Sequence, residues 1–518
     1  MRNANNIVPA ALQQKIVGES LSDDSGREQT LSQAPLGPEA FCTPFILQQK
    51  TIAEYRHFLE QTLLPSLVDV LSPKFIGHMT GPVPPFIQEL QQWITLQNQN
   101  LVKWETSGAG TLLERQVLGS FHRLFYQAPA AFYGQYIQDP SSSLGNITSG
   151  GTLSNLTAIS YALSRKLQDA GATFHEAGLM KSLQDTGYTR AVVMGTAHCH
   201  YSLQKVMRLL GLGTRAFVAL DADELSGAAG SQILDAKIRH LQAEGVLVIA
   251  LVGVAGTTEA GRIDPLEMMA EVAARHQVHF HVDAAFGGAF LFSDQYASKL
   301  KGISDADSIT LCGHKQLYLP MGTSLCLFKS PGLAKQIEIN SYYQARKGSV
   351  DLGKYTIEGS RPFSALLFHG ALQVIGKEGY AAMVDSNYAR TLLFSEKIRS
   401  NSHFQLYRHP DLNIVLYRYV PAALREKALA GRLNDAERTL LNERNIYLQQ
   451  EQFRRRESFV SYTEMPDETG KRHVWLRSVL MNPDTTAQHL EEILQEQLTI
   501  MHASEDIKTY KSKEYGNQ

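Results

Sequence analysis

A small-residue turn, Ser149-Gly150-Gly151-Thr152, stands directly before a helical pattern that continues to about residue 165. Glycines let the backbone approach an anion closely, and a helix start offers free N–H groups and the positive end of the helix dipole. The segment is therefore a candidate phosphate cradle. When such a pattern stands alone, a simple turn before a helix is the commoner explanation.

Two histidines flank a cysteine in the run His198-Cys199-His200. Both residue types bind zinc, but no second pair of ligands stands at the spacing typical of a structural zinc site. The sequence therefore predicts no metal site. The remaining explanations are an imidazole ring stacked on a flat ligand and plain packing in the core.

A carboxylate ends a strand-like segment at residues 279–283. His279, His281 and Asp283 alternate with Phe280 and Val282, as side chains do on the two faces of a strand. Small residues follow, so Asp283 is expected to be partly buried at the edge of a sheet. A buried charge requires a partner, which could be a protonated pyridine nitrogen or a structural arginine.

A lysine follows a second strand-like segment, because the apolar run at residues 308–312 leads into Gly313-His314-Lys315. Desolvation favours the neutral, nucleophilic form of a lysine amine. Lys315 is therefore a candidate for covalent chemistry. An exposed loop lysine is the alternative explanation of an isolated His-Lys pair.

A sheet must position these residues, because short apolar runs alternate with amphipathic helical patterns from about residue 145 onward. Six candidate strands lie at residues 189–194, 216–220, 246–253, 279–285, 308–312 and 323–328. Continuous apolar strands separated by helices predict an α/β fold with a mostly parallel sheet covered on both faces. In such sheets ligands bind beyond the carboxyl ends of the strands.

The chain has 518 residues, which is too long for one simple domain. The polar residues 1–40 are expected to form a weakly ordered arm, and residues 41–115 a helical and loop segment that packs in a dimer. Residues 116–375 are expected to form the large cofactor-binding domain. Residues 376–518 contain three further strand patterns and are expected to form a smaller C-terminal α/β domain.

The composition argues against several classes of protein. Lys plus Arg (49) nearly balances Asp plus Glu (51), so no charge excess points to nucleic acid or a membrane surface. The four cysteines lie far apart and suit reduced thiols. The longest apolar stretch, residues 245–256, is too short to span a bilayer, and the first residues do not read as a secretory signal. The expected setting is the cytoplasm.

One cofactor explains all four chemical segments together. Pyridoxal phosphate needs a cradle for its phosphate, an acid partner for its ring nitrogen, a lysine for its aldehyde and a flat group against its ring. The turn at residues 149–152, Asp283, Lys315 and His200 supply these groups. The combination predicts that Lys315 holds pyridoxal phosphate as a Schiff base.

The chain also closely resembles the group II pyridoxal-phosphate-dependent amino acid decarboxylases, which include glutamate, aromatic amino acid and histidine decarboxylases. Besides the four segments, the resemblance includes NQNLVKWETSGAGTLLERQVL (98–118), AGTTEAGRIDPL (255–266) and GKYTIEGSRPFSALLFHGAL (353–372). It runs from about residue 45 to the end of the second domain. It implies the type I fold of pyridoxal-phosphate-dependent transferases and a homodimer with shared active sites.

The resemblance implies roles for the matching residues. Asp283 is expected to pair with the ring nitrogen, His200 to stack on the ring, and Tyr343, in preference to Tyr342, to protonate the substrate from a mobile loop. The phosphate is expected to be held by Gly151, Thr152, Ser308 and His314, with Gly150 as a further cofactor contact, and Thr258 and Ala285 are expected to lie near the ring. Cys312-Gly313 stands where many members have Asn-Pro, so Cys312 cannot supply an amide contact to the phosphate.

Arg361 and His78 are the expected substrate-binding residues. Arg361 falls on an arginine of the family, and a guanidinium binds carboxylates bidentately; a structural salt bridge is the alternative. His78 and Thr80 could donate hydrogen bonds to an acidic substrate.

The overall sequence is most similar to the bacterial members that convert aspartate to β-alanine and CO2. Glutamate, cysteine sulfinate, 2,4-diaminobutyrate and aromatic amino acids are alternative substrates. A carbon–carbon lyase and a non-catalytic scaffold are the rival functions.

Overall fold

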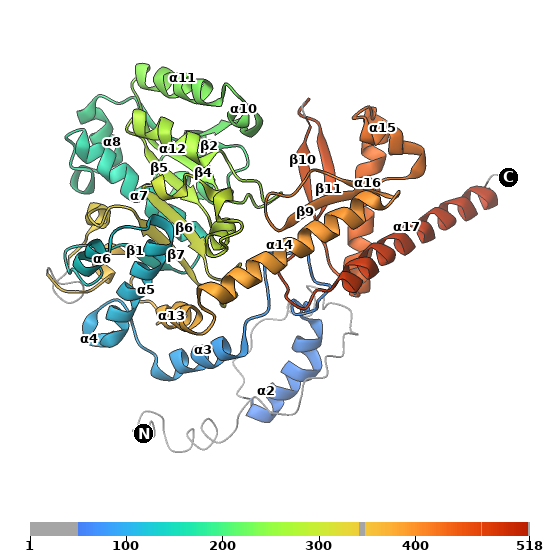
Figure 1. Ribbon diagram of the computed structural model, residues 1–518, viewed down its shortest axis with the longest axis horizontal. Coiled ribbons are helices and arrows are strands. Elements are labelled where there is room, and N and C mark those ends of the chain that lie inside the picture. Colours follow the sequence, from blue (N-terminus) through green and yellow to red (C-terminus); the bar gives the residue numbers. More distant parts are fainter. Residues whose placement is uncertain (1–49, 341–347, 468, 516–518) are drawn as a thin grey trace.

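The computed structural model describes residues 50–340, 348–467 and 469–515 of the chain (Figure 1). Both Tyr342 and Tyr343, and the expected N-terminal arm, lie outside these residues. The described residues form one seven-stranded sheet and one four-stranded sheet. None of their helices is both long and apolar enough to cross a membrane.

The large sheet has the strand order β1-β7-β6-β5-β4-β2-β3. Its strands are β1 (Gly145–Thr148), β2 (Arg190–Thr196), β3 (Phe217–Leu220), β4 (Val246–Val254), β5 (His279–Asp283), β6 (Ser308–Cys312) and β7 (Ser324–Phe328). Neighbouring strands from β3 to β6 are parallel, whereas β7 runs antiparallel to β6 and β1. The predicted α/β fold with a mostly parallel sheet is confirmed.

Helices cover both faces of the large sheet because its strands are apolar on both sides. On β2, Val192 and Met194 belong to the apolar cluster that includes α11 and α12, while Ala191 and Val193 belong to the cluster that includes α7 and α9. The helices packed on this sheet are α5 (Ala109–Tyr126), α7 (Gly151–Asp169), α9 (Ser202–Leu209), α11 (Gly230–Ala243) and α12 (Leu266–Arg275).

Seven further α-helices belong to this part of the described chain. They are α2 (Ile52–Phe58), α3 (Pro85–Gln97), α4 (Trp104–Ser107), α6 (Ala130–Tyr136), α8 (Phe174–Thr186), α10 (Ala222–Ser226) and α13 (Ala365–Val374). The Pro-rich segment before α3 is extended, as its prolines predict, and carries His78 toward the large sheet.

The C-terminal part forms a smaller α/β body around an antiparallel sheet with the order β10-β11-β9-β8. Its elements are α14 (Gly376–Ser400), β8 (Phe404–Leu406), β9 (Ile414–Tyr419), α15 (Arg425–Leu429), α16 (Asp435–Arg455), β10 (Ser461–Pro466), β11 (Arg472–Val479) and α17 (Ala487–Tyr515). Figure 1 shows α14 in orange between the two sheets. The exact domain boundaries stay a prediction.

Candidate active site

The predicted motif residues meet at one edge of the large sheet. Asp283 ends β5, Cys312 ends β6, and Gly151 begins α7. The carboxyl ends of these parallel strands therefore lie beside the start of a helix. A cavity of about 340 Å³ opens there. It is lined by His78, Gly150, Gly151, Thr152, Asn155, His200, Tyr201, Val254, Gly256, Thr258, Asp283, Ala285, Cys312, His314 and Lys315.

The start of α7 fits a phosphate group. Gly150 and Gly151 line the cavity where this helix of 19 residues begins, and a helix start favours an anion. A Cβ atom on Gly151 would lie 2.9 Å from Cys312 Sγ, so only glycine allows the backbone this close to β6. The predicted cradle therefore has the shape and the dipole that a phosphate requires.

Asp283 is a buried carboxylate, 6% exposed, at the end of β5. Its Oδ2 accepts a hydrogen bond from Asn155 Nδ2 at 2.9 Å, and its Oδ1 accepts one from the backbone N–H of Ala285 at 3.2 Å. Among the described residues no cation forms an ion pair with it. A protonated ring nitrogen in the cavity would supply the missing positive charge.

His200 presents an uncharged ring to the same cavity. Its Nδ1 accepts a hydrogen bond from the backbone N–H of Ser202 at 3.2 Å, and its ring centroid lies 4.2 Å from that of Tyr201. Burial lowers the pKa of His200. This geometry fits a ring that stacks on a flat ligand. No cluster of three metal-binding side chains occurs in the part of the chain that the structure describes.

The Lys315 side chain lies half-buried in the cavity wall, and its amine makes no ion pair or hydrogen bond with any described residue. His78 and His314 line the same cavity as Lys315, and burial lowers the pKa of both rings, with a smaller contribution from the positive charge of Lys315. The Nδ1–H of His314 donates to the Thr323 carbonyl at 3.0 Å, which holds its ring in place. Lys315 is therefore positioned as an available amine.

A second chamber of about 410 Å³ adjoins the cavity and shares His78, His200, Thr258, His314 and Lys315 with it. Arg477 on β11 and Glu259 also line this chamber. The sequence interpretation missed Arg477. The available signal was a charged residue within the otherwise apolar strand pattern of residues 473–481.

The structure corrects the expectation for Ser308. This residue begins β6, whereas the cavity lies at the other end of that strand, beyond Cys312. The Ser308 hydroxyl is fully buried and lies 2.8 Å from His279 Nε2 and 2.9 Å from His281 Nδ1. Ser308 therefore does not reach a phosphate at the start of α7.

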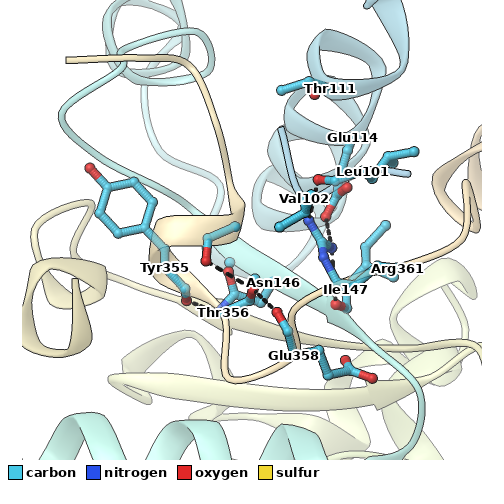
Figure 2. Close-up of polar contacts among 12 residues, drawn as sticks. Leu101, Val102, Thr111, Glu114, Asn146, Ile147, Tyr355, Thr356, Glu358 and Arg361 are labelled. Atoms are coloured by element: carbon cyan, nitrogen blue, oxygen red, sulfur yellow. Dashed lines mark hydrogen bonds and ion pairs between the residues drawn. The ribbon is translucent and has the colours of Figure 1, made fainter. Parts of the chain in front are cut away.

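The structure also corrects the expectation for Arg361. Its Nη1 forms an ion pair with Glu114 Oε1 at 2.6 Å, and its Nη2 donates to the Leu101 carbonyl at 3.0 Å (Figure 2). Both charged side chains are buried, at 6% and 1% exposure, and neither lines the cavity or the chamber. The salt-bridge alternative therefore describes Arg361, because Glu114 on α5 occupies its guanidinium.

Breaking this pair is expected to destabilise the fold. Arg361→Met leaves the Glu114 carboxylate buried without a cation, which costs about 3–5 kcal/mol in the free energy of unfolding. The double variant Glu114→Leu/Arg361→Met removes both charges and is expected to recover most of that loss. Denaturant unfolding of the three proteins measures the difference. Equal stability of wild type and Arg361→Met would contradict a structural role.

Comparison with known proteins agrees with the geometry of the site. The family described as the pyridoxal-dependent decarboxylase conserved domain matches residues 54–420. Aspartate 1-decarboxylase of Aliivibrio fischeri is 38% identical over 462 residues, covering 88% of this chain and 84% of that protein. L-2,4-diaminobutyrate decarboxylase of Rhizobium meliloti is 32% identical, covering 68% of this chain and 66% of that protein.

A solved structure shares the fold of the chain. The crystal structure of mouse CSAD superposes with a TM-score of 0.77 at 23% identity, covering 90% of this chain and 92% of that chain. This likeness supports the type I fold. The chain therefore belongs to the pyridoxal-dependent decarboxylase family, as a carboxy-lyase that uses pyridoxal phosphate to decarboxylate an amino acid.

Proposed function

We propose that this enzyme removes the α-carboxylate of L-aspartate and forms β-alanine and CO2. The observation that carries the proposal is Arg477, a buried cation that lines the substrate-sized chamber beside the cofactor cavity. This cation favours a substrate that carries a second carboxylate besides the one that leaves as CO2. The likeness of most of the chain to a protein named aspartate 1-decarboxylase supports aspartate among the acidic amino acids.

The contacts of Arg477 leave part of its guanidinium free for a ligand. Its Nε donates to the Thr258 carbonyl at 2.8 Å and its Nη1 to the Gly77 carbonyl at 3.1 Å, while Nη2 has no partner among the described residues. Burial lowers the pKa of Arg477 to about 10, so the side chain stays cationic at neutral pH. A carboxylate in the chamber would satisfy this charge.

We also propose which residues hold the cofactor. The start of α7, from Gly150 to Thr152, would bind the phosphate with His314 nearby, and Asp283 would face the ring nitrogen. His200 would lie against the ring, with Thr258 and Ala285 beside it. Bound pyridoxal phosphate supplies an electron sink for the breaking bond between Cα and the carboxylate.

The protein side chains would govern orientation and proton transfer. Asp283 would stabilise positive charge on the ring nitrogen from its buried position at the end of β5. Arg477 and the ring of His200 would fix the substrate so that the departing carboxylate stands perpendicular to the ring. Lys315 would bond the cofactor and return to it when product leaves. Tyr343, outside the described residues, stays the proposed proton donor to the substrate carbon.

A basic substrate is the second candidate because of Glu259. Glu259 lines the same chamber as Arg477, and its Oε2 is buried without a hydrogen-bond partner in the described part of the chain. An ammonium group on a substrate would satisfy that oxygen. The likeness to L-2,4-diaminobutyrate decarboxylases points the same way, so this diamino acid belongs in any substrate test.

We propose a homodimer with shared active sites as well. Apolar side chains are exposed on the N-terminal segment and on α3, among them Leu67 at 53%, Trp93 at 56% and Leu96 at 76%. A second copy of the chain would cover these surfaces. Light scattering should give about twice the chain mass of 57.5 kDa, whereas a monomer would contradict the proposal.

Side-by-side assays of CO2 release from aspartate, glutamate and 2,4-diaminobutyrate test the substrate. We expect kcat/KM to be highest for aspartate. Arg477→Met is expected to lower kcat/KM for aspartate by about 10²- to 10³-fold, because a buried charge pair is lost, and Arg477→Lys by less. The control is Arg472→Met, whose side chain lies on the same strand, is 68% exposed and should not affect kcat/KM.

Two outcomes would overturn this proposal. Faster CO2 release from glutamate or 2,4-diaminobutyrate than from aspartate would contradict the substrate. Unchanged kcat/KM in Arg477→Met would contradict the role of the arginine.

A further inference from the structure

A polar stripe crosses the otherwise apolar interior beneath α7. On β5, His279, His281 and Asp283 point to the α7 side, while Phe280 and Val282 belong to the apolar cluster on the other face. On β6, Ser308 and Thr310 join the stripe. The five polar side chains are all at most 6% exposed, so each polar atom in the stripe requires a partner.

The hydrogen bonds of the stripe form one connected chain. Asn155 on α7 reaches Asp283 with Nδ2 at 2.9 Å and His281 Nε2 with Oδ1 at 3.1 Å. The Nδ1 of His281 lies 2.9 Å from Ser308 Oγ, and Ser308 Oγ lies 2.8 Å from His279 Nε2. Asp283 is therefore linked through Asn155, His281 and Ser308 to His279 at the opposite end of β5.

Chemistry fixes the direction of every bond in this chain. A carboxylate only accepts, so the Asn155 atom that faces Asp283 must be the NH2 group, and its Oδ1 must accept. Oδ1 receives the Thr310 hydroxyl at 2.7 Å and the Nε2–H of His281. The Nδ1 of His281 must then accept from Ser308, and Ser308 must accept from the Nε2–H of His279.

Both histidines of the chain are neutral at physiological pH, as this direction requires. Burial lowers the pKa of His279 and of His281 to about 4, and the opposing influence of Asp307 and Asp283 is smaller. Arg165 and Lys166 lower the pKa of His279 further. With both histidines neutral, all donors of the chain are aligned toward Asp283.

We propose that His279, Ser308, His281 and Asn155 form a positioning relay that holds Asp283 as an oriented carboxylate facing the ring nitrogen of the cofactor. The inference rests on the proposed role of Asp283 and deepens it. His281 is the central member, because its two nitrogens fix the Asn155 amide on one side and the Ser308 hydroxyl on the other. Loss of its Nε2–H removes one of the two hydrogen bonds that Asn155 Oδ1 accepts and leaves Thr310 alone to hold the amide oxygen.

Paired substitutions at His281 test the relay. Glutamine places an N–H donor where Nε2 lies, whereas asparagine reaches only the Nδ1 position. We expect His281→Asn to weaken binding of pyridoxal phosphate by about 10-fold, the upper end of the range for one lost hydrogen bond between neutral groups. His281→Gln should stay within about threefold of wild type. Cofactor titration of the apoenzyme, followed by visible absorbance across pH, measures both effects without any substrate.

The controls separate the relay from simple damage to the sheet. Val282→Ala shortens a side chain on the opposite face of β5 and should lower thermal stability without changing cofactor affinity or the pH dependence of the absorbance. Asp283→Asn is the positive control and should change both the cofactor affinity and the pH dependence of the absorbance. Ser308→Ala should also lower cofactor affinity, but by less than His281→Asn.

Three results would overturn the relay. Equal cofactor affinity and absorbance in His281→Gln and His281→Asn would contradict the relay, whether both variants match wild type or both bind the cofactor equally weakly. If Val282→Ala lowered cofactor affinity as much as His281→Asn, disturbed packing of β5 would explain the effect without the relay. Wild-type behaviour of Asp283→Asn would refute the role of Asp283 itself, and the relay with it.

Discussion

Replacing Lys315 with alanine is expected to lower kcat for amino acid decarboxylation by about 10³-fold or more. The substitution removes the amine in the cavity wall that would bond the cofactor, and nucleophilic and proton-transfer groups contribute on this scale. Release of CO2 at saturating pyridoxal phosphate measures the loss. Retention of more than a tenth of wild-type kcat would contradict the assigned role.

Two further variants define what Lys315 contributes. Lys315→Arg keeps a positive charge but offers no comparable nucleophile, so it should be nearly as inactive as Lys315→Ala. Lys301→Ala removes a lysine whose side chain is 74% exposed and pairs with Glu267, and it should leave kcat unchanged. High activity in Lys315→Arg would show that charge alone matters at this position.

Asp283→Asn is expected to lower kcat by about 10²- to 10³-fold. The amide has nearly the same shape as the carboxylate and can keep the bond from the Ala285 N–H, but it cannot stabilise positive charge on the ring nitrogen. The variant should therefore fold and still lose activity. Steady-state kinetics together with thermal unfolding separate the two effects.

The matched control for this variant is Asp305→Asn. Asp305 is 60% exposed and pairs with Lys329 on the surface, so loss of its charge should leave kcat unchanged. If Asp283→Asn kept more than half of wild-type kcat, the buried carboxylate would have no part in the chemistry.

The sequence predicted much of the fold because the parallel strands are continuous apolar runs. Two strands were missed for a physical reason. β1 is only four residues long with one large apolar side chain, Ile147, and β10 has the polar sequence SYTEMP with alternate side chains exposed. Both patterns lack the apolar signal that a doubly covered strand carries.

The site was predictable where its residues lie in compact motifs at strand ends. Asp283, Lys315 and His200 all line the cavity in which they were expected to meet. Arg361 was assigned wrongly, because no local pattern reveals that its partner is Glu114, 247 residues away. Arg477 stands out as a charged residue in its strand, but it was missed because nothing local shows that this strand of the C-terminal sheet reaches the chamber.

Ser308 shows a subtler failure of the sequence interpretation. Its type suits a phosphate contact, and its strand does lead to the cavity, but it stands at the start of that strand. A side chain reaches the cavity only if it stands near the carboxyl end of its strand; belonging to a strand that leads to the cavity is not enough. The same position makes Ser308 available to His279 and His281.

Borohydride reduction of the enzyme loaded with pyridoxal phosphate, followed by peptide mapping with mass spectrometry, locates the lysine that bonds the cofactor. We expect a stable pyridoxyl group on the peptide that contains Lys315, and none on that peptide when reduction is omitted. Label on a different lysine, or no label in a preparation that releases CO2 from an amino acid, would contradict the assignment of Lys315 as the cofactor-bearing residue.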